Sequence, residues 1–212
     1  GYASLGANTT GTNNTAVGKD AGAAITTAQG NSILGTLAGD ALTTGGDNVA
    51  VGYKALTAST TGTANTAVGK DALEANTTAS NNTAVGFKVL EANTTGTGNT
   101  AVGMSALLSN TDANANSALG FGALQTNTTG AGNSAFGYSA LNANTTGGQN
   151  VAVGDNALGA NTTADYNTAL GTSTLQLNTT GVNNVATGAF SLTANTTGDN
   201  NVAMGYQALK SN

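Results

Sequence analysis

Carboxylates are the side chains with the clearest acid–base potential in this chain, because the sequence contains no histidine and no cysteine. The usual catalytic triads and zinc sites are therefore excluded. Ten Asp and Glu residues accompany five lysines, for a net charge of -5. Asp71 and Glu74 are close in sequence, and paired carboxylates can serve glycoside hydrolysis when the fold holds them together. Their chemistry thus depends on the elements that position them.

Those elements repeat every 17 residues, without insertion or deletion. Each repeat carries a glycine after a small apolar pair, an asparagine four residues before it, and an Asn-Thr-Thr segment. The glycine column runs from Gly1 to Gly205 and the asparagine column from Asn14 to Asn201. Representative members of the glycine, asparagine and threonine columns are Gly69, Gly86, Gly103, Asn14, Asn65, Asn82, Asn99, Thr77 and Thr94.

In this register the charged residues fall in scattered columns. Lys54 and Lys88 stand one repeat before and after Asp71, which predicts a charge ladder on the surface. No aspartate recurs in every repeat, unlike in calcium-binding β-roll repeats. We therefore expect no enzyme activity, no metal site and no cofactor.

The repeat length and composition predict an all-β fold. Seventeen residues are too few for a helix-turn-helix repeat, which needs about 33 or more. The unit is rich in Thr, Val, Asn and Gly, which favour strands and turns. We predict a parallel β-solenoid, or β-roll, of about twelve coils, each with a strand pair and tight turns.

Stacking gives each column a predicted role. The Gly69 column is expected at a bend that residues with a Cβ avoid. Asparagine amides can bond from coil to coil, so we predict one ladder from Asn14 to Asn201 and a second from Asn8 to Asn212. The Thr77 column is expected to form a hydroxyl ladder at a corner.

The strand has two apolar faces. Side chains alternate along a strand, so Thr66 and Val68 share one face and Ala67 takes the other. We predict that the Thr66 and Val68 columns point inward with the Leu73 column, and that the alanine column faces a partner chain. In the reverse arrangement alanine fills a narrow lumen and valine points outward. Both leave an apolar outer stripe that requires a partner surface. The predicted alanine interface comprises Ala67, Ala84 and Ala101.

The column after the glycine contains six of the nine aromatic residues. It also contains Lys19 and Lys70, so it cannot be fully buried. We interpret it as the rim of an interface or an exposed stacking strip. Its candidate interface residues are Tyr53, Phe87, Phe121 and Tyr138.

The chain lacks the basic stripe that nucleic-acid binding requires, and no run of 18 apolar residues predicts membrane insertion. We expect residues 1–212 to form a single repeat array. Because neither end has an atypical capping segment, we expect an excerpt of a longer protein, or one unit of an assembly that continues end to end.

The unit from Asn65 to Leu73, NTAVGKDAL, resembles the head repeats of trimeric autotransporter adhesins. It is still more similar to repeat arrays in bacteriophage and prophage tail-fibre proteins. Asn65, Ala67, Val68 and Gly69 occupy the motif positions, although the motif is one residue shorter and the repeat longer than in the adhesins. The resemblance implies a β-roll in which three chains pack around a common axis. It also implies an extracellular location, on a virion tail fibre or a bacterial cell surface.

The resulting hypothesis is a structural shaft or head segment that gives rigidity and surface display for attachment. A host-surface receptor or glycan would contact variable columns, at Lys54, Glu74, Tyr138 and Asp155. The alternatives are an ice-binding β-solenoid and a self-assembling filament subunit. The adjacent threonines of Asn-Thr-Thr would point to opposite faces of a strand, which favours a corner ladder over an ice-binding array.

Overall fold

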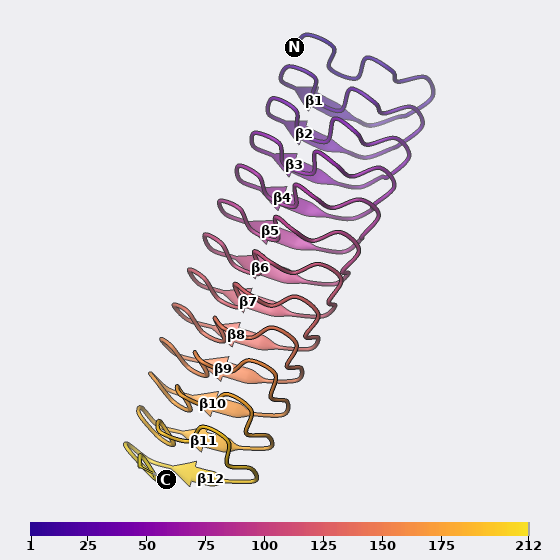
Figure 1. Cartoon of the computed structure of the whole chain (residues 1–212). Helices are drawn as coiled ribbons and strands as arrows, with labels where there is room; N and C mark the ends of the chain where they lie inside the picture. Colours follow the sequence, from indigo (N-terminus) through magenta and orange to yellow (C-terminus); the bar gives the residue numbers. More distant parts are fainter. Residues whose placement is uncertain (212) are drawn as a thin grey trace. The chain divides into compact units, whose positions relative to one another are not determined.

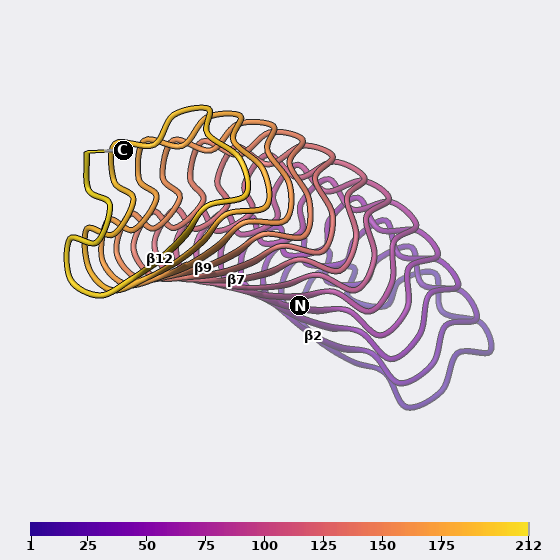
Figure 2. The same cartoon turned by 90° about the horizontal axis from the view of Figure 1, so that it is seen from below.

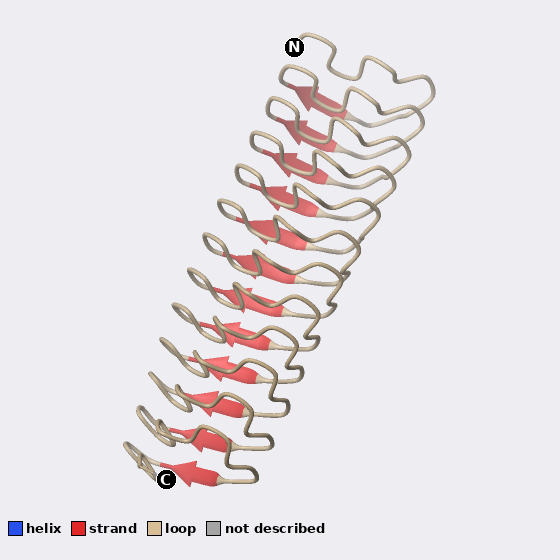
Figure 3. Cartoon of the chain, in the orientation of Figure 1, coloured by secondary structure: helices blue, strands red, loops and turns tan. Residues whose placement is uncertain are grey.

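The computed structural model describes residues 1–211, and Asn212, the last member of the predicted second asparagine ladder, lies outside them. The chain forms two compact units, Gly1–Ser105 and a second that begins at Ala106. Both are built from the same 17-residue coil, and the described part contains strands and turns but no helix (Figure 3). A search of residues 1–211 for a helix able to cross a membrane accordingly finds none.

In the first unit, each coil contributes one strand to a parallel sheet, and consecutive strands pair in sequence order (Figure 1). Partners in the sheet are 17 residues apart, as in Ala67 opposite Ala84. The strands are β1 (Thr15–Val17), β2 (Ser32–Leu34), β3 (Val49–Val51), β4 (Thr66–Val68), β5 (Thr83–Val85) and β6 (Thr100–Val102).

The second unit repeats this arrangement with the same parallel pairing and the same register. Seen from below, consecutive coils within each unit follow one outline (Figure 2). The strands are β7 (Ser117–Leu119), β8 (Ser134–Phe136), β9 (Val151–Val153), β10 (Thr168–Leu170), β11 (Val185–Thr187) and β12 (Val202–Met204).

The prediction of a parallel β-solenoid with about twelve coils of 17 residues is confirmed. The predicted strand pair is wrong, because each coil has a single strand of 3 residues. The rest of the coil is turn, and its backbone bonds run to the neighbouring coils. For example, Leu56 N donates to Ala72 O at 3.0 Å and Asp71 N to Tyr53 O at 3.0 Å.

The predicted inside and outside of the strand are reversed in the structure. Ala67, Ala84 and Ala101 are 0% exposed within one chain, so they fill the lumen and do not form an intermolecular interface. Thr66 and Val68 on either side are partly exposed and point outward. The reason is space: opposite the strand, the lumen already holds a leucine in most coils. Only a small side chain then fits between the two walls.

The predicted burial of the leucine column is confirmed, and its backbone explains how it is achieved. Ala72 and Leu73 are both fully buried, which the alternation of a strand would forbid. Asp71 and Leu73 adopt left-handed conformations, with φ of 58° and 52°, and this breaks the alternation. A left-handed residue costs about 1–2 kcal/mol. Burying a leucine contributes about 1.5–3 kcal/mol, so burial outweighs the strain.

The glycine column forms the predicted bend. Gly69, Gly86 and Gly103 have φ of 135°, 136° and 124°, which residues with side chains rarely adopt. Space is limiting as well, because a Cβ on Gly69 would collide with the backbone carbonyl of Gly86 in the next coil. The column therefore needs glycine for both conformation and stacking distance.

The first asparagine ladder is confirmed. The Asn65 side chain donates to Ala79 O at 2.9 Å, and its Oδ1 accepts the backbone N–H of Asn82 at 3.1 Å. The Asn82 side chain in turn accepts the N–H of Asn99 at 2.9 Å. At the N-terminal end, Asn14 bonds to Asn31 in the same way. Each buried amide thus joins adjacent coils.

The threonine ladder is also confirmed, with backbone carbonyls as acceptors. Thr77 Oγ1 donates to Thr94 O at 3.2 Å, and Thr60 Oγ1 donates to Thr77 O at 3.2 Å. The hydroxyl therefore bonds along the coil stack, as a corner ladder requires.

The second asparagine ladder is interrupted near the N-terminus. Its positions hold Ile25, Leu42 and Ser59, all buried. Among the described residues, Ser59 Oγ is the buried side-chain polar atom without a hydrogen-bond partner. The unbroken ladder instead links Asn93 to Asn76 in the first unit, at 3.2 Å.

Two of these interruptions compensate for missing leucines. Gly22 and Gly39 occupy the leucine column, and Ile33 replaces alanine in the strand between them. A Cβ on Gly22 would lie 2.9 Å from Ile25 Cδ1 and 3.0 Å from Ile33 Cδ1. The isoleucines therefore occupy the space that leucine fills in other coils, and core volume is conserved across columns.

Gly69→Ala should lower the free energy of unfolding by at least about 1–3 kcal/mol, the usual cost of a strained backbone conformation, because alanine also meets the Gly86 carbonyl. Gly98→Ala is the matched control. Gly98 has φ of 67°, but a Cβ added there would meet nothing within 4 Å, and Ala64 and Ala115 occupy the same column. Chemical denaturation followed by circular dichroism measures both. Equal losses would contradict the stacking explanation.

Ile33→Ala restores the common strand residue but should cost about 2–5 kcal/mol, because it opens a cavity beside Gly22 and Gly39. Adding Gly39→Leu should recover part of this loss by refilling the space. A double-mutant cycle in thermal denaturation tests the coupling. Purely additive effects would show that the two positions do not share a volume.

Candidate functional site

The outward side of the sheet is the largest regular surface of each unit. We call the first and third residues of strands β1–β6 the outer sheet face of the first unit, and those of β7–β12 that of the second. These residues are Thr, Ser, Val, Leu, Phe and Met, and none is charged. Val17 and Leu34 are 55% and 51% exposed, and Leu119 is 49% exposed.

Such a face is unusual for an isolated parallel sheet, because parallel sheets are normally covered on both sides. Here the alanine side is covered by the chain's own turns, whereas the valine side has no cover from its own chain. The apolar outer stripe expected from the sequence is therefore present, but Val68 and Val85 form it instead of Ala67 and Ala84.

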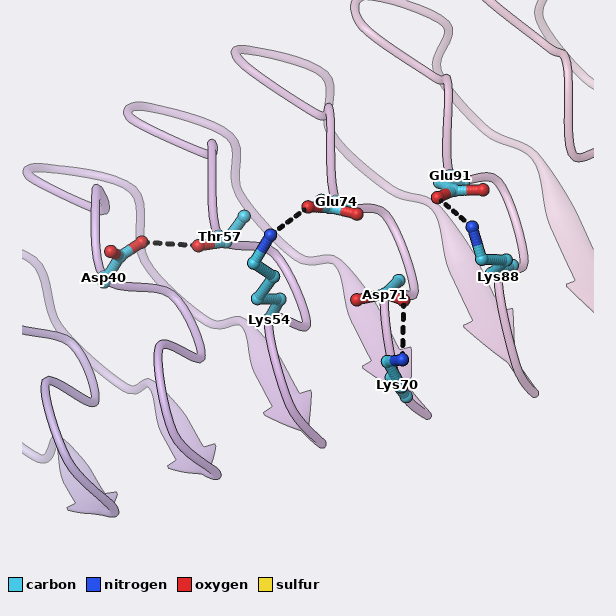
Figure 4. A network of polar contacts seen from close by, with 8 residues as sticks. All are labelled: Asp40, Lys54, Thr57, Lys70, Asp71, Glu74, Lys88 and Glu91. Carbon is cyan, nitrogen blue, oxygen red and sulfur yellow. Dashed lines mark hydrogen bonds and ion pairs between the residues drawn. The ribbon is translucent and has the colours of Figure 1, made fainter.

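A charged network lies on the turns of the first unit (Figure 4). Lys54 Nζ lies 2.9 Å from Glu74 Oε1, and Lys88 Nζ lies 2.8 Å from Glu91 Oε1. The hydrogen bond from Lys54 to Glu74, assisted by the charge of Glu74, raises the pKa of Lys54. This pair therefore contributes stability below the ordinary lysine pKa and loses it as the pH rises through the raised value. Because both lysines are exposed, the contribution is small.

Three carboxylates of this network come close enough to hold a metal ion. The ligand oxygens of Asp71, Glu74 and Glu91 lie within 4.8 Å of one another. Each also faces an ammonium group, because Lys70 Nζ lies 3.7 Å from Asp71 Oδ2 and the glutamates pair with Lys54 and Lys88. A cation would have to compete with three lysines, so the arrangement fits the predicted charge ladder better than a metal centre.

The aromatic column is exposed, as predicted. Lys70 Nζ lies 5.9 Å from the ring centroid of Tyr53 and 5.6 Å from that of Phe87, so one ammonium contacts two rings. In the second unit, Phe121 and Tyr138 stack with centroids 5.3 Å apart and planes 8° apart. The column thus forms a stacking strip, and cation–π contacts of this kind contribute about 0.5–1 kcal/mol at exposed sites.

Two shallow grooves in the second unit were not predicted from the sequence. The first has a volume of about 240 Å³ and is lined by Ala131, Thr146, Gly148, Gln149, Asp165 and Tyr166. The second has a volume of about 380 Å³ and includes Asn142, Asn156, Gln176 and Leu177. Both lie over columns whose residues vary without a period. The available signal was Tyr166, the sole aromatic residue in its column.

The predicted site residues thus separate into three groups. The ladder residues lie in the core and the aromatic candidates on the surface, whereas the alanine candidates leave the interface and join the core. Comparison of the chain with protein-family models, with curated proteins and with solved structures finds no match.

Proposed function

We propose that this chain is a structural, non-catalytic segment of an extracellular fibre, in which the outer sheet face packs against further copies of the same chain. The observation that carries the proposal is an uncharged, apolar face on a parallel sheet that its own chain leaves uncovered. The resemblance of the Asn65–Leu73 unit to tail-fibre and adhesin repeats supports three copies around one axis.

The coil construction suits this role physically. Each coil is tied to its neighbours by backbone, Asn65-type and Thr77-type hydrogen bonds, so the surface columns keep a constant spacing near 4.8 Å. The outer sheet face can then serve assembly, while the charged network and the aromatic column remain free for display. This division of faces replaces the predicted assembly through alanine.

Val68→Lys combined with Val85→Lys should dissociate the assembly, because the interface would have to bury two unpaired charges. The strand signal in circular dichroism should persist, since both valines point outward. Light scattering at micromolar concentration measures the mass. The matched control is Thr78→Lys with Thr95→Lys, which adds the same charge to exposed positions in the same region of the chain.

The proposal fails if the wild-type protein is monomeric under these conditions or if the valine variant keeps its assembled mass. A continuous series of masses, in place of one defined oligomer, would favour the filament alternative.

Ice binding is a second candidate because the strand threonines point outward, contrary to our expectation. Thr66 with Val68, Thr83 with Val85, and the equivalent pair in β6 form a regular hydroxyl and methyl array in the first unit. In the second unit the third strand residue varies among Leu, Phe, Val, Thr and Met, which makes the array uneven. Ice binding predicts measurable thermal hysteresis, and Thr83→Leu should reduce it. No hysteresis in the wild-type protein would eliminate this candidate.

A further inference from the structure

We propose that the groove lined by Gln149, Asp165 and Tyr166 in the second unit binds a neutral saccharide. This inference rests on the proposed function as a displayed surface element and specifies the ligand class and its site. The groove holds about 240 Å³. That is below the roughly 300–1,000 Å³ typical of ligand pockets, so a single sugar unit at the surface is the appropriate scale.

Tyr166 is the first reason. It adopts a left-handed conformation with φ of 59°, which is a genuine outlier for a bulky residue. Asn, Asp or Gly fill eight of the twelve positions of this column, and these residues tolerate left-handed backbone well. The Tyr166 side chain is 56% exposed, so core packing does not explain its presence. Strain retained without a packing gain points to a functional use.

The space beside Tyr166 comes from small residues. Ala131 and Gly148 occupy the column of Asp165 in the two preceding coils, and Gly132 occupies the column of Gln149 and Tyr166. The side chains therefore grow from one coil to the next, which leaves a step with an aromatic wall. A tyrosine ring offers a flat apolar surface beside a hydroxyl group, which suits the mixed faces of a sugar ring.

The polar groups of the groove match a ligand with several hydroxyls. Asp165 Oδ1 is fixed because it accepts the backbone N–H of Gly148 at 2.6 Å. Within residues 1–211, no hydrogen bond from a protein group is made to Asp165 Oδ2, the Thr146 hydroxyl or the Gln149 side-chain amide. A carboxylate accepts from hydroxyl groups, whereas an amide both donates and accepts. Together with the ring they form a short polar rim around one apolar wall.

Charge decides which sugars fit. From Ala106 onward the chain has four aspartates and one lysine, and Asp165 lies in the groove itself. An anionic sugar would face a carboxylate with no cation lining the groove, which is unfavourable. A neutral hexose can instead donate its hydroxyl hydrogens to Asp165.

The experiment titrates the intact chain with glucose, galactose, mannose and N-acetylglucosamine, and with N-acetylneuraminic acid as the anionic comparison. Saturation-transfer NMR detects weak binding, and calorimetry gives the dissociation constant. At least one neutral sugar should bind, and more tightly than the acid. Tyr166→Asn and Asp165→Asn should each weaken binding about tenfold or more, since a hydrogen bond to a charged group is worth roughly that factor.

The repeat supplies two controls. Tyr166→Asn introduces the residue found in this column at Asn183 and Asn200, so its melting temperature should stay equal or rise while binding falls. Asp199→Asn changes an aspartate in the same column as Asp165, which accepts the backbone N–H of Val182 at 2.7 Å as Asp165 accepts that of Gly148. It should leave binding unchanged.

The inference is overturned if no neutral sugar binds, if the acid binds better, or if Asp199→Asn weakens binding as much as Asp165→Asn. Light scattering on the same samples separates the two proposals. An assembled protein that binds no sugar refutes the groove alone, whereas a monomer that binds sugar refutes the fibre alone.

Discussion

A buried asparagine must find hydrogen-bond partners, and in this protein it finds them one coil away. Asn65, Asn82 and their equivalents carry donors and acceptors into a narrow, fully buried lumen. Leaving such a group unpaired costs about 1–3 kcal/mol, so each coil must place its amide in register with the next. The fixed register then aligns every other column, including the bends, the outward valines and the charged turns.

The lumen sets the second constraint, because it is only wide enough for one large side chain per coil. Leucine occupies that place in a left-handed conformation, and alanine and glycine fill the remainder. Where Gly22 and Gly39 remove the leucine, Ile25, Ile33 and Leu42 return the volume from other columns. The core therefore conserves volume instead of residue identity, as close packing requires.

The sequence was sufficient for the period, the parallel register, the Asn65 ladder and the Gly69 bend, because each depends on one residue type that recurs in one column. It was insufficient for the orientation of Thr66, Ala67 and Val68, because both faces of that strand are apolar and alternation alone fits either direction. Lumen width decides between them, and that width follows from left-handed residues such as Asp71 and Leu73, which have no sequence signature of their own. The groove beside Tyr166 depends on two adjacent columns of the repeat in which no single residue type recurs.

The register of 17 also determines how such a chain can change its length in evolution. Losing one residue from a turn would displace every following asparagine from its partner, as Asn82 is partnered by Asn65. Losing or gaining a whole coil would leave each remaining amide with an equivalent neighbour. Insertions and deletions are thus tolerated in steps of one repeat, and unequal recombination between similar coding repeats supplies steps of that size. A family of such proteins should differ in coil number while conserving coil length.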